Sequence, residues 1–467
     1  MKRFSFLDFD LLNLSGLEKG NSYWADVLLH CALPNVNSTS ARRHRFGIVS
    51  WLPWLALQCF KSHAFDIERS GHCTVYACSL STSAHEGTLT PVLKNLARND
   101  RTHVIGIFSQ SEKPVEGIHL AEPVCTFYAL SLPQSFASGV KVFFLTLMHS
   151  LQIALQLLKM GEIELLLNIR WSWFDEKLAL YYFCKERLKQ YNVDRQPLIL
   201  TYELLPEIKA LVMHFRHGDS RVIHIMHGQR LPTYQITMAT DLVLLSNIDE
   251  PWFRARVDPS VKLWAIGHPR LEDVRRQVGL PRDKTTDLPR ITFFSQPAEG
   301  DYSRSQRIAD WKICASLRGK SEVRFRAHPR EDRAILATDM KAAGIDFMQV
   351  SEAGLIEDLK WCDAVASSWS TVSMEAAACG RGIFWTCSTP EKYEASRELR
   401  DHGIGVLIQN SPDWTPYLRQ WSESGWKSPV TVSDEQLHEL GMIGDTSKSW
   451  MERLEIEVAT LSPKIEG

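Results

Sequence analysis

The sequence lacks a charge imbalance, since 53 lysines and arginines stand against 55 aspartates and glutamates among 467 residues. A net charge of -2 gives no overall attraction to nucleic acid, so we expect no nucleic-acid partner. The ten cysteines include no C-x-x-C pair. That spacing argues against a zinc knuckle, a redox motif and a secreted disulfide scaffold, and it favours a cytoplasmic protein.

Long uninterrupted apolar runs are also missing, and a membrane-spanning helix needs about 20 predominantly apolar residues. The run Phe46–Phe60 contains Pro53 and is too short, while Val140–Leu158 is interrupted by a lysine, a histidine and two glutamines. We interpret Val140–Leu158 as a buried core helix. Aspartates at positions 8 and 10 interrupt any signal-peptide core. Peripheral contact with the inner membrane face stays open, because the 15 tryptophans suit a core or an interface.

Short apolar runs alternate with amphipathic stretches along most of the chain. The predicted strands are Thr102–Ser109, Ile163–Arg170, Pro197–Glu203, Arg221–Gly228, Leu242–Asn247, Lys262–Gly267, Arg290–Ser295, Glu322–His328, Asp346–Ser351, Asp363–Ser367, Gly382–Cys387 and Gly405–Gln409. The predicted helices between them include Glu176–Gln190, Ser303–Leu317, Arg330–Ala343 and Thr371–Cys379. This alternation is typical of α/β proteins with doubly wound parallel sheets.

A stretch rich in proline and charge lies between Gly267 and Arg290 and divides the chain. At roughly 150 residues per domain, a chain of this length holds two or three domains. We predict an N-terminal domain over 1–266 and a C-terminal domain over 267–445. An amphipathic helix within 446–467 could pack back on the first domain.

The sharpest chemical motif is the strand-to-helix turn within Asp363–Gly380. Its hydroxyl side chains are Ser367, Ser368, Ser370 and Thr371. Hydroxyls and backbone N–H groups at a helix start cap the helix and favour an anion such as a phosphate. Glu375, one turn further on, could accept hydrogen bonds from ribose hydroxyls. The alternative is an ordinary capped helix with an exposed glutamate.

A second motif ends a predicted strand, where ligands bind in open α/β sheets. Arg326, His328 and Pro329 stand together there. A histidine or arginine at this place can stabilise negative charge on a phosphate leaving group. The alternative is a structural histidine before a turn.

Two further strand ends carry small and polar residues that suit the same ligand. Ser295 and Gln296 follow one strand, and Gly267 and Arg270 follow another at the domain junction. Each pair is also compatible with a simple turn.

Candidates for a general base lie in the first half of the chain. Glu203 and His227 end two predicted strands, and Gly228 permits close backbone approach. Asp175 and Glu176 are a second acidic pair. For these carboxylates, the alternative is an acid near a helix start that complements the helix dipole.

Four histidines in this region form two H-x-x-H spacings, at His214, His217, His224 and His227. On a strand, residues three apart face opposite sides of the sheet. No cysteine or clear carboxylate accompanies them, so we expect no metal site.

Together the motifs resemble the GT-B glycosyltransferases that build bacterial surface polysaccharides. The pattern is most similar to the sialyltransferase, polysialyltransferase and Kdo transferase groups, with their His-Pro and Ser-Ser/Thr motifs. The Gly-x-Pro-Arg and His-Gly elements also resemble the CDP-glycerol glycerophosphotransferases. The resemblance covers about Ile199 to Gly382, and the first 160 or so residues match no family.

The resemblance implies two Rossmann-like doubly wound domains that face an interdomain cleft, an acceptor-binding domain over 1–266 and a nucleotide-sugar-binding domain over 267–445. It implies inverting, metal-independent transfer of a sugar, such as a CMP-activated nonulosonic acid or Kdo, to a glycan or lipid-linked glycan of capsule or lipopolysaccharide. His328 and the turn Ser367–Thr371 would hold the donor phosphate, and the first half would supply the base. The acidic-acidic-Gly motif of sialyltransferases is absent, because Lys177 follows Asp175 and Glu176. We therefore expect Glu203 or His227 as the base.

Three alternative functions remain open from the sequence. They are a nucleotide-sugar 2-epimerase, a CDP-glycerol-type glycerophosphotransferase and a non-catalytic glycan-binding subunit. The first two would share the two-domain fold, and the last would need no chemistry at His328.

Overall fold

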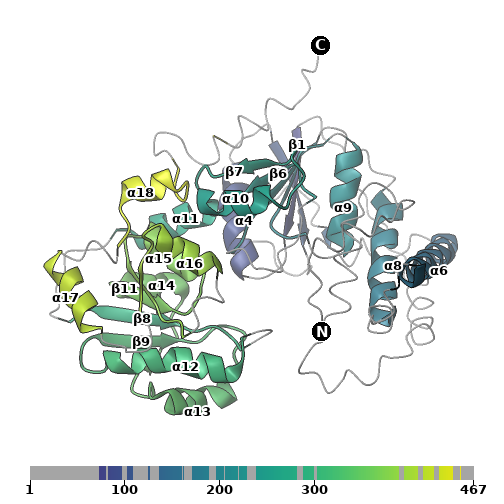
Figure 1. The fold of residues 1–467 in the computed structure, drawn as a ribbon. Helices are drawn as coiled ribbons and strands as arrows, with labels where there is room; N and C mark the ends of the chain where they lie inside the picture. The colour runs from purple at the N-terminus through teal and green to yellow at the C-terminus, as the bar shows by residue number, and fades with distance from the viewer. Residues whose placement is uncertain are drawn as a thin grey trace.

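The protein is described here by a computed structural model (Figure 1). The described residues are 73–79, 83–96, 102–108, 125–126, 136–159, 161, 171–188, 196–203, 206–218, 220–228, 238–280, 288–298, 302–388, 394–408, 414–424, 431–444 and 453, with further side chains left out at element ends. They form two parallel sheets, one after the other along the chain, each flanked by helices.

The first sheet has the strand order β3-β2-β1-β4-β5-β6-β7. Its strands are β1 Cys73–Ser79, β2 Thr102–Phe108, β3 Cys125–Thr126, β4 Leu198–Leu200, β5 Val222–Ile225, β6 Asp241–Val243 and β7 Lys262–Trp264. Every strand pair is parallel. All residues of β4, β5 and β6 are buried, as expected for a parallel sheet with both faces covered.

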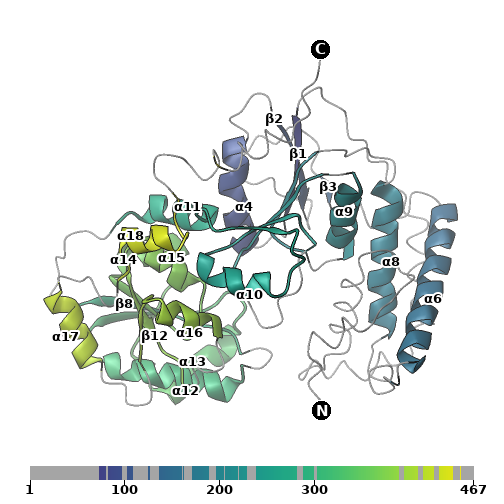
Figure 2. The same ribbon diagram turned by 45° about the horizontal axis from the view of Figure 1, so that its top comes forward.

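The helices of the first domain are α4 Ser83–Leu96, α6 Phe136–Lys159, α8 Trp171–Leu188, α9 Pro206–His217 and α10 Glu250–Arg254, with the 3-10 turn η2 Asn247–Asp249. Of these, α9, α8 and α6 form successive layers on one side of the sheet (Figure 2). Helix α9 packs between the sheet and α8, and α6 lies on the outer side of α8. Helix α4 lies away from these three, beside the second domain.

The second sheet has the order β10-β9-β8-β11-β12-β13 and is parallel throughout. Its strands are β8 Arg290–Phe294, β9 Glu322–Arg326, β10 Gln349–Val350, β11 Ala364–Ser367, β12 Gly382–Trp385 and β13 Val406–Leu407. Both sheets thus run outward over their first three strands and then return to the other side of the first strand. This is the strand order of dinucleotide-binding domains, so the predicted pair of Rossmann-like doubly wound domains is confirmed.

The second domain is covered by short helices on both faces of its sheet. They are α11 Pro269–Val278, α12 Arg304–Cys314, η3 Ala315–Leu317, α13 Arg333–Ala343, α14 Leu355–Trp361, α15 Val372–Ala378, α16 Glu394–Asp401, α17 Thr415–Glu423 and α18 Asp434–Glu439. Ser303 caps α12 by accepting a hydrogen bond from Gln306 N, and Asp332 caps α13 through Ala334 N. A buried aromatic cluster of Phe293, Trp311 and Phe325 packs under α12.

The chain crosses between the domains twice, and the two crossings lie side by side. Gly267 N and His268 N donate to the carbonyls of Gly441 and Met442, at 3.0 and 3.1 Å. A side chain at Gly441, which has φ of 63°, would collide with the backbone of Ala265. The chain therefore returns to the first domain at residues 440–444. The helix predicted within 446–467 lies outside the described residues except for Arg453.

Most predicted strands are confirmed to within a few residues at their ends. The central strand β1 and the edge strand β3 were not among the predicted strands. Small and polar residues make up much of β1 (CTVYACS), so its local apolar signal is weak. The predicted strand Ile163–Arg170 lies outside the described residues.

The run Val140–Leu158 does form a helix, α6, but the prediction that it is buried in the core is wrong. Its outward side chains are 38% to 65% exposed, because α6 packs on α8 rather than on the sheet. By length and composition α6 is the one described helix that could cross a membrane, a criterion that core helices of soluble proteins also meet.

Candidate functional site

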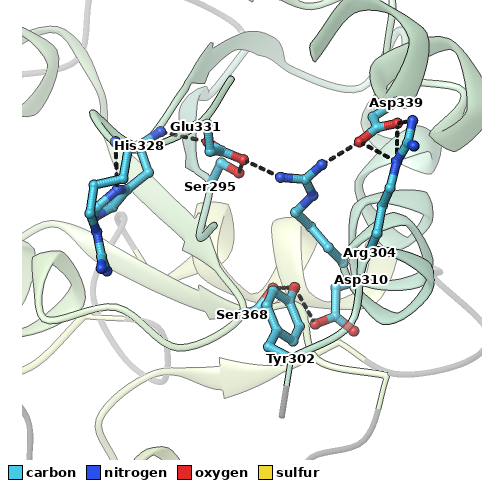
Figure 3. A network of polar contacts seen from close by, with 10 residues as sticks. Ser295, Tyr302, Arg304, Asp310, His328, Glu331, Asp339 and Ser368 are labelled. Carbon is cyan, nitrogen blue, oxygen red and sulfur yellow. Dashed lines mark hydrogen bonds and ion pairs between the residues drawn. The ribbon is translucent and has the colours of Figure 1, made fainter. Parts of the chain in front are cut away.

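The candidate site lies at the carboxyl edge of the second sheet. The strand order reverses between β8 and β11, and open α/β sheets bind ligands beyond the strand ends at such a point. Ser295 and Gln296 follow β8, His328 follows β9, and Ser368 and Ser370 follow β11. Strands β9 and β11 lie on either side of β8, with about 4.8 Å between neighbouring strands, so the structure brings the predicted strand-end residues to one edge of the sheet (Figure 3).

The hydrogen bonds of His328 determine which of its ring nitrogens carries the proton. Its backbone N–H donates to Glu331 Oε2 at 2.6 Å, and its Nδ1 accepts from the backbone N–H of Arg330 at 3.2 Å. Burial, together with the nearby Arg330 charge, lowers the pKa of His328 to about 4. The ring is therefore neutral at pH 7 and carries its proton on Nε2, which makes Nε2 a hydrogen-bond donor.

Two neighbours of His328 in the sequence do not join this edge as partners. Arg326 donates to Asp358 Oδ2 at 2.7 Å and to the carbonyl of Ala353, on the α14 side of the sheet. Pro329 is exposed in the turn before α13. The predicted donor-binding role therefore rests on His328 in this motif.

A buried ionic network holds the His328 turn from behind (Figure 3). Glu331 Oε1 accepts from Ser295 Oγ at 2.7 Å and from Arg307 Nη1 at 3.0 Å. The other arm of Arg307 donates to Asp339, which Arg304 also contacts. Burial raises the pKa of Glu331. The carboxylate of Glu331 thus ties the ends of β8 and β9 together.

A second buried carboxylate, Asp310, holds three loops at the same edge. Its Oδ2 accepts from the Tyr302 hydroxyl at 2.9 Å, and its Oδ1 accepts from the backbone N–H of Ser388 at 2.7 Å and from the Ser388 hydroxyl. The Tyr302 hydroxyl lies 3.4 Å from Ser368 Oγ. Asp310 is fully buried, and burial raises its pKa. It therefore links the segments before α12, after β11 and after β12.

The hydroxyl side chains of the serine-rich turn after β11 make different contacts. Ser367 Oγ lies 2.9 Å from Ser373 Oγ, and both are buried, so Ser367 holds the turn against α15. Ser370 Oγ accepts from the backbone N–H of Val372 at 3.3 Å, whereas Thr371 makes no side-chain cap. Ser367 is the last residue of β11, and the predicted hydroxyls of Ser368, Ser370 and Thr371 lie beyond the strand end.

Residues of both domains meet beside this turn. A side chain at Gly228, beyond β5, would lie 3.3 Å from Thr371 Oγ1. Arg270, at the start of α11, forms an ion pair with Glu375 on α15, and Gly87 of α4 lies against the Arg270 guanidinium. Glu375 is 1% exposed, and its Oε2 has no hydrogen-bond partner among the described residues.

Gly267 has a structural position at the junction. Its φ is 94°, and a side chain there would collide with Glu272 and with the backbone of Gly444. His268, next to it, is fully buried, and its Nε2 lies 2.6 Å from the carbonyl of Met226 beyond β5. Gly267 is therefore held by close backbone packing between the two crossings, and its role in donor binding stays a prediction.

The surroundings of Glu203 do not favour its predicted role as general base. Glu203 is buried, its Oε1 lies 2.7 Å from His224 Nδ1, and its Oε2 accepts from Met238 N at 2.8 Å. Lys209 Nζ lies 3.7 Å from the same oxygen. Both carboxylate oxygens are thus taken up inside the first domain. The reason is tertiary: β5, the segment before β6 and α9 all converge on this side chain.

His227 is the other predicted base, and this assignment stays a prediction. Its Nδ1 lies 3.1 Å from the carbonyl of Thr201, and burial followed by the nearby His224 lowers its pKa to about 4. A neutral ring that donates through Nδ1 carries the lone pair on Nε2. Asp175 and Glu176 lie in the second turn of α8, not near a helix start, and their side chains are outside the description.

Sequence reasoning missed Tyr302, Arg307, Asp310, Glu331 and Ser388. Glu331 had a local signal, because a carboxylate three residues after His328, just before a helix, resembles a capping box. The others had none, since their partners come from segments 8 to 78 residues away.

Fold and site together define a protein of two doubly wound α/β domains, with a polar site at the strand ends of the second domain beside the junction. No protein-family model and no curated protein matches the chain.

Among solved structures, the chain is similar to a glycosyltransferase from Rickettsia africae, with 10% identity over 85% of this chain and 100% of that one, at a TM-score of 0.45. It is similar to the UDP-GlcNAc 2-epimerase from Neisseria meningitidis bound to UDP-GlcNAc, with 10% identity over 83% and 99% of the two chains and a TM-score of 0.46. The calicheamicin glycosyltransferase has 10% identity over 85% and 100%, with a TM-score of 0.44. Similarities at this level carry no conclusion about activity.

Proposed function

We propose that this protein is an inverting, metal-independent glycosyltransferase of the GT-B type that uses a nucleotide-sugar donor. The observation that carries the proposal is the common edge of β8, β9 and β11. There the neutral His328 and the hydroxyls of Ser368 and Ser370 stand at the strand-order reversal, beside residues of the first domain. The motif resemblance supports a CMP-linked nonulosonic acid or Kdo as donor. It also supports a cytoplasmic role in capsule or lipopolysaccharide synthesis.

Donor binding divides between two groups of residues. His328 Nε2–H and the Ser368 and Ser370 hydroxyls would donate hydrogen bonds to the phosphate. The Glu375 oxygen for which the described part of the chain supplies no partner would accept from ribose hydroxyls, and Arg270 would supply positive charge beside it. Gln296 lies beyond β8, where it can contact the base or sugar.

The transfer step needs a base for the acceptor and stabilisation of the leaving group. His227 Nε2 would take the proton from an acceptor hydroxyl as its oxygen bonds to the anomeric carbon. The bond from that carbon to the phosphate oxygen would break, and its electron pair would stay on the nucleotide phosphate. His328 would stabilise this developing charge by donating its Nε2 proton in a hydrogen bond. Glycan or lipid-linked glycan acceptors at the inner membrane face would enter from the first domain.

Thermal unfolding in the presence of CMP and UDP tests the donor site. A ligand at 100 times its Kd stabilises the folded state by about 2.7 kcal/mol, which raises Tm by roughly 5–10 °C for a domain of this size. We expect such a rise with CMP. His328→Ala should remove most of it, whereas His438→Ala, at an exposed histidine in the same domain, should leave it intact.

The same protein samples separate the alternative functions. CMP release from a CMP-sugar that depends on an added acceptor, and that falls at least a hundredfold in His328→Ala, supports the transferase. A rise of Tm with UDP alone would favour the 2-epimerase or another transferase. Binding without any turnover, unchanged by His328→Ala, would point to a non-catalytic glycan-binding subunit and refute the proposal.

A further inference from the structure

One face of α6 carries a row of large apolar side chains that point away from the protein. These residues, the α6 stripe, are Val140, Phe144, Met148, Leu151, Leu155 and Leu158, and each is 38% to 65% exposed. Exposed apolar residues scattered singly are ordinary, but a continuous row marks an interaction surface. Among the described residues, the remaining exposed large apolar side chains are Leu280, Leu288 and Ile335, which are not on this helix.

The opposite face of α6 packs within the chain. Val142, Ile153 and Leu157 are buried, α6 packs along α8 (Figure 2), and Tyr182 of α8 hydrogen-bonds to His149. The helix therefore has two apolar faces, one buried and one exposed. A helix with an apolar face on both sides is suited to lie between two other elements.

The spacing within the α6 stripe suits packing against another helix. From Phe144 to Leu158 the apolar residues follow one another in alternating steps of four and three residues. This is the heptad spacing with which one α-helix packs along another, because it keeps a single seam facing the partner helix. A flat lipid surface requires no such seam.

The charges of α6 also distinguish a helix partner from a membrane. Helices that lie on membranes carry a strongly charged face rich in lysine and arginine. The only charged residues in α6 are Lys141 and Lys159, and Lys141 is paired with Glu186 of α8 at 2.8 Å. The face opposite the stripe is occupied by α8, so no basic face is left to meet anionic lipid headgroups.

The area of the stripe reaches the lower limit for a dimer. An aromatic side chain buries about 150–250 Å², and if the aliphatic residues of the stripe are taken at the low end of this range, six that are about half exposed offer on the order of 500 Å² per copy. Two copies together bury about 1,000 Å², which is the smallest size of a specific interface. A helix that packs on its own symmetry mate needs no further partner, and two-fold dimers are the commonest assemblies.

We propose that the α6 stripe is a self-association surface, on which α6 of a second copy of this chain packs to form a two-fold dimer. This surface lies on the outer side of α8, away from the candidate donor site. The inference is therefore independent of the proposed function.

Sedimentation velocity over a hundredfold range of protein concentration tests the assignment. We expect the wild type to shift from monomer to dimer within this range. The double variant Leu151→Gln with Leu155→Gln should remain monomeric, with its dimer dissociation constant raised at least a hundredfold. Both side chains are exposed, so the variant should keep its circular dichroism spectrum and Tm in the monomer range.

A matched control is available elsewhere on the surface. Leu280→Gln with Leu288→Gln makes the same change at two leucines that are 54% and 44% exposed, and it should dimerise like the wild type. A wild type that stays monomeric, or a stripe variant that dimerises normally, would overturn the proposal. If the monomeric wild type sediments with phosphatidylglycerol vesicles and the stripe variant does not, the stripe faces lipid and the dimer assignment is wrong.

Discussion

Replacing Arg307 by methionine tests whether the network behind His328 is as buried as the structure has it. Arg307 is 4% exposed and donates to Glu331 at 3.0 Å and to Asp339. Methionine retains much of the side-chain volume and removes the charge. Asp339 still keeps Arg304 as a partner, so Glu331 bears most of the loss.

The expected magnitude follows from burial. Two unit charges about 3 Å apart attract by roughly 5 kcal/mol at an effective dielectric constant near 20. After the cost of desolvation is included, removal of one partner of a buried pair typically lowers the free energy of unfolding by about 3–5 kcal/mol. We therefore expect Arg307→Met to lower the stability of the second domain by about that amount.

Urea unfolding followed by tryptophan fluorescence measures this loss, since Trp311 lies 4.8 Å from the Arg307 guanidinium and reports on the same domain. Arg333→Met is the matched control. Arg333 and its partner Glu352 are 77% and 69% exposed, so this change should cost less than about 1 kcal/mol.

The pH dependence gives a second, independent readout. Burial raises the pKa of Glu331, and the loss of Arg307 should raise that pKa further. A carboxyl whose folded pKa is raised lowers stability as pH rises above its unfolded value of about 4.3. The deficit of Arg307→Met should therefore be smaller near pH 5 than near pH 7.5. Equal and small losses in Arg307→Met and Arg333→Met, without pH dependence, would refute the reasoning.

Three further predictions concern titration, the site and the junction. Burial lowers the pKa of His268 to about 3, so the unfolded chain binds a proton at this histidine more tightly than the folded chain. The free energy of unfolding should therefore fall as pH drops below about 6.5. His268→Gln should reduce this pH dependence in urea unfolding curves recorded at a series of acidic pH values. Asp310→Asn should weaken nucleotide binding about tenfold in calorimetry, because the amide cannot accept all the hydrogen bonds of the carboxylate; unchanged affinity would remove Asp310 from the support of the site. Gly441→Ala should lower Tm more than Gly279→Ala, because both have positive φ but only Gly441 faces backbone, at Ala265; equal shifts would contradict the close packing of the crossings.

The α/β class and much of the site were accessible from local pattern. Apolar runs such as Arg290–Phe294 and Ala364–Ser367 are long enough and buried enough to stand out, and helices between them enforce parallel pairing. Because all parallel strands end at the same side of a sheet, polar residues that follow them must share an edge. His328, Ser368 and Ser295 could therefore be assigned to one edge of the sheet before the fold was known.

The hydrogen-bond and ion-pair partners of these side chains could not be predicted from the local sequence pattern. They depend on which distant segments the fold brings together. Glu203 lies three residues beyond the end of β4, and His224 and Met238 surround its carboxylate. In the sequence, nothing distinguishes Arg307 from other arginines in helices, although in the structure it donates a hydrogen bond to the buried Glu331.

For α6, the sequence predicted the helix, but only the tertiary structure showed which of its faces is exposed. Periodicity indicates that Val140–Leu158 is helical and apolar all round, and such a helix is expected in a core. Whether a second apolar face is covered depends on which layers lie beyond it, and α8 covers only one. Local sequence specifies backbone preference and polarity, because these act between residues a few positions apart. Burial and charge pairing arise from contacts across long separations, and they follow from the order in which the strands and helices are packed.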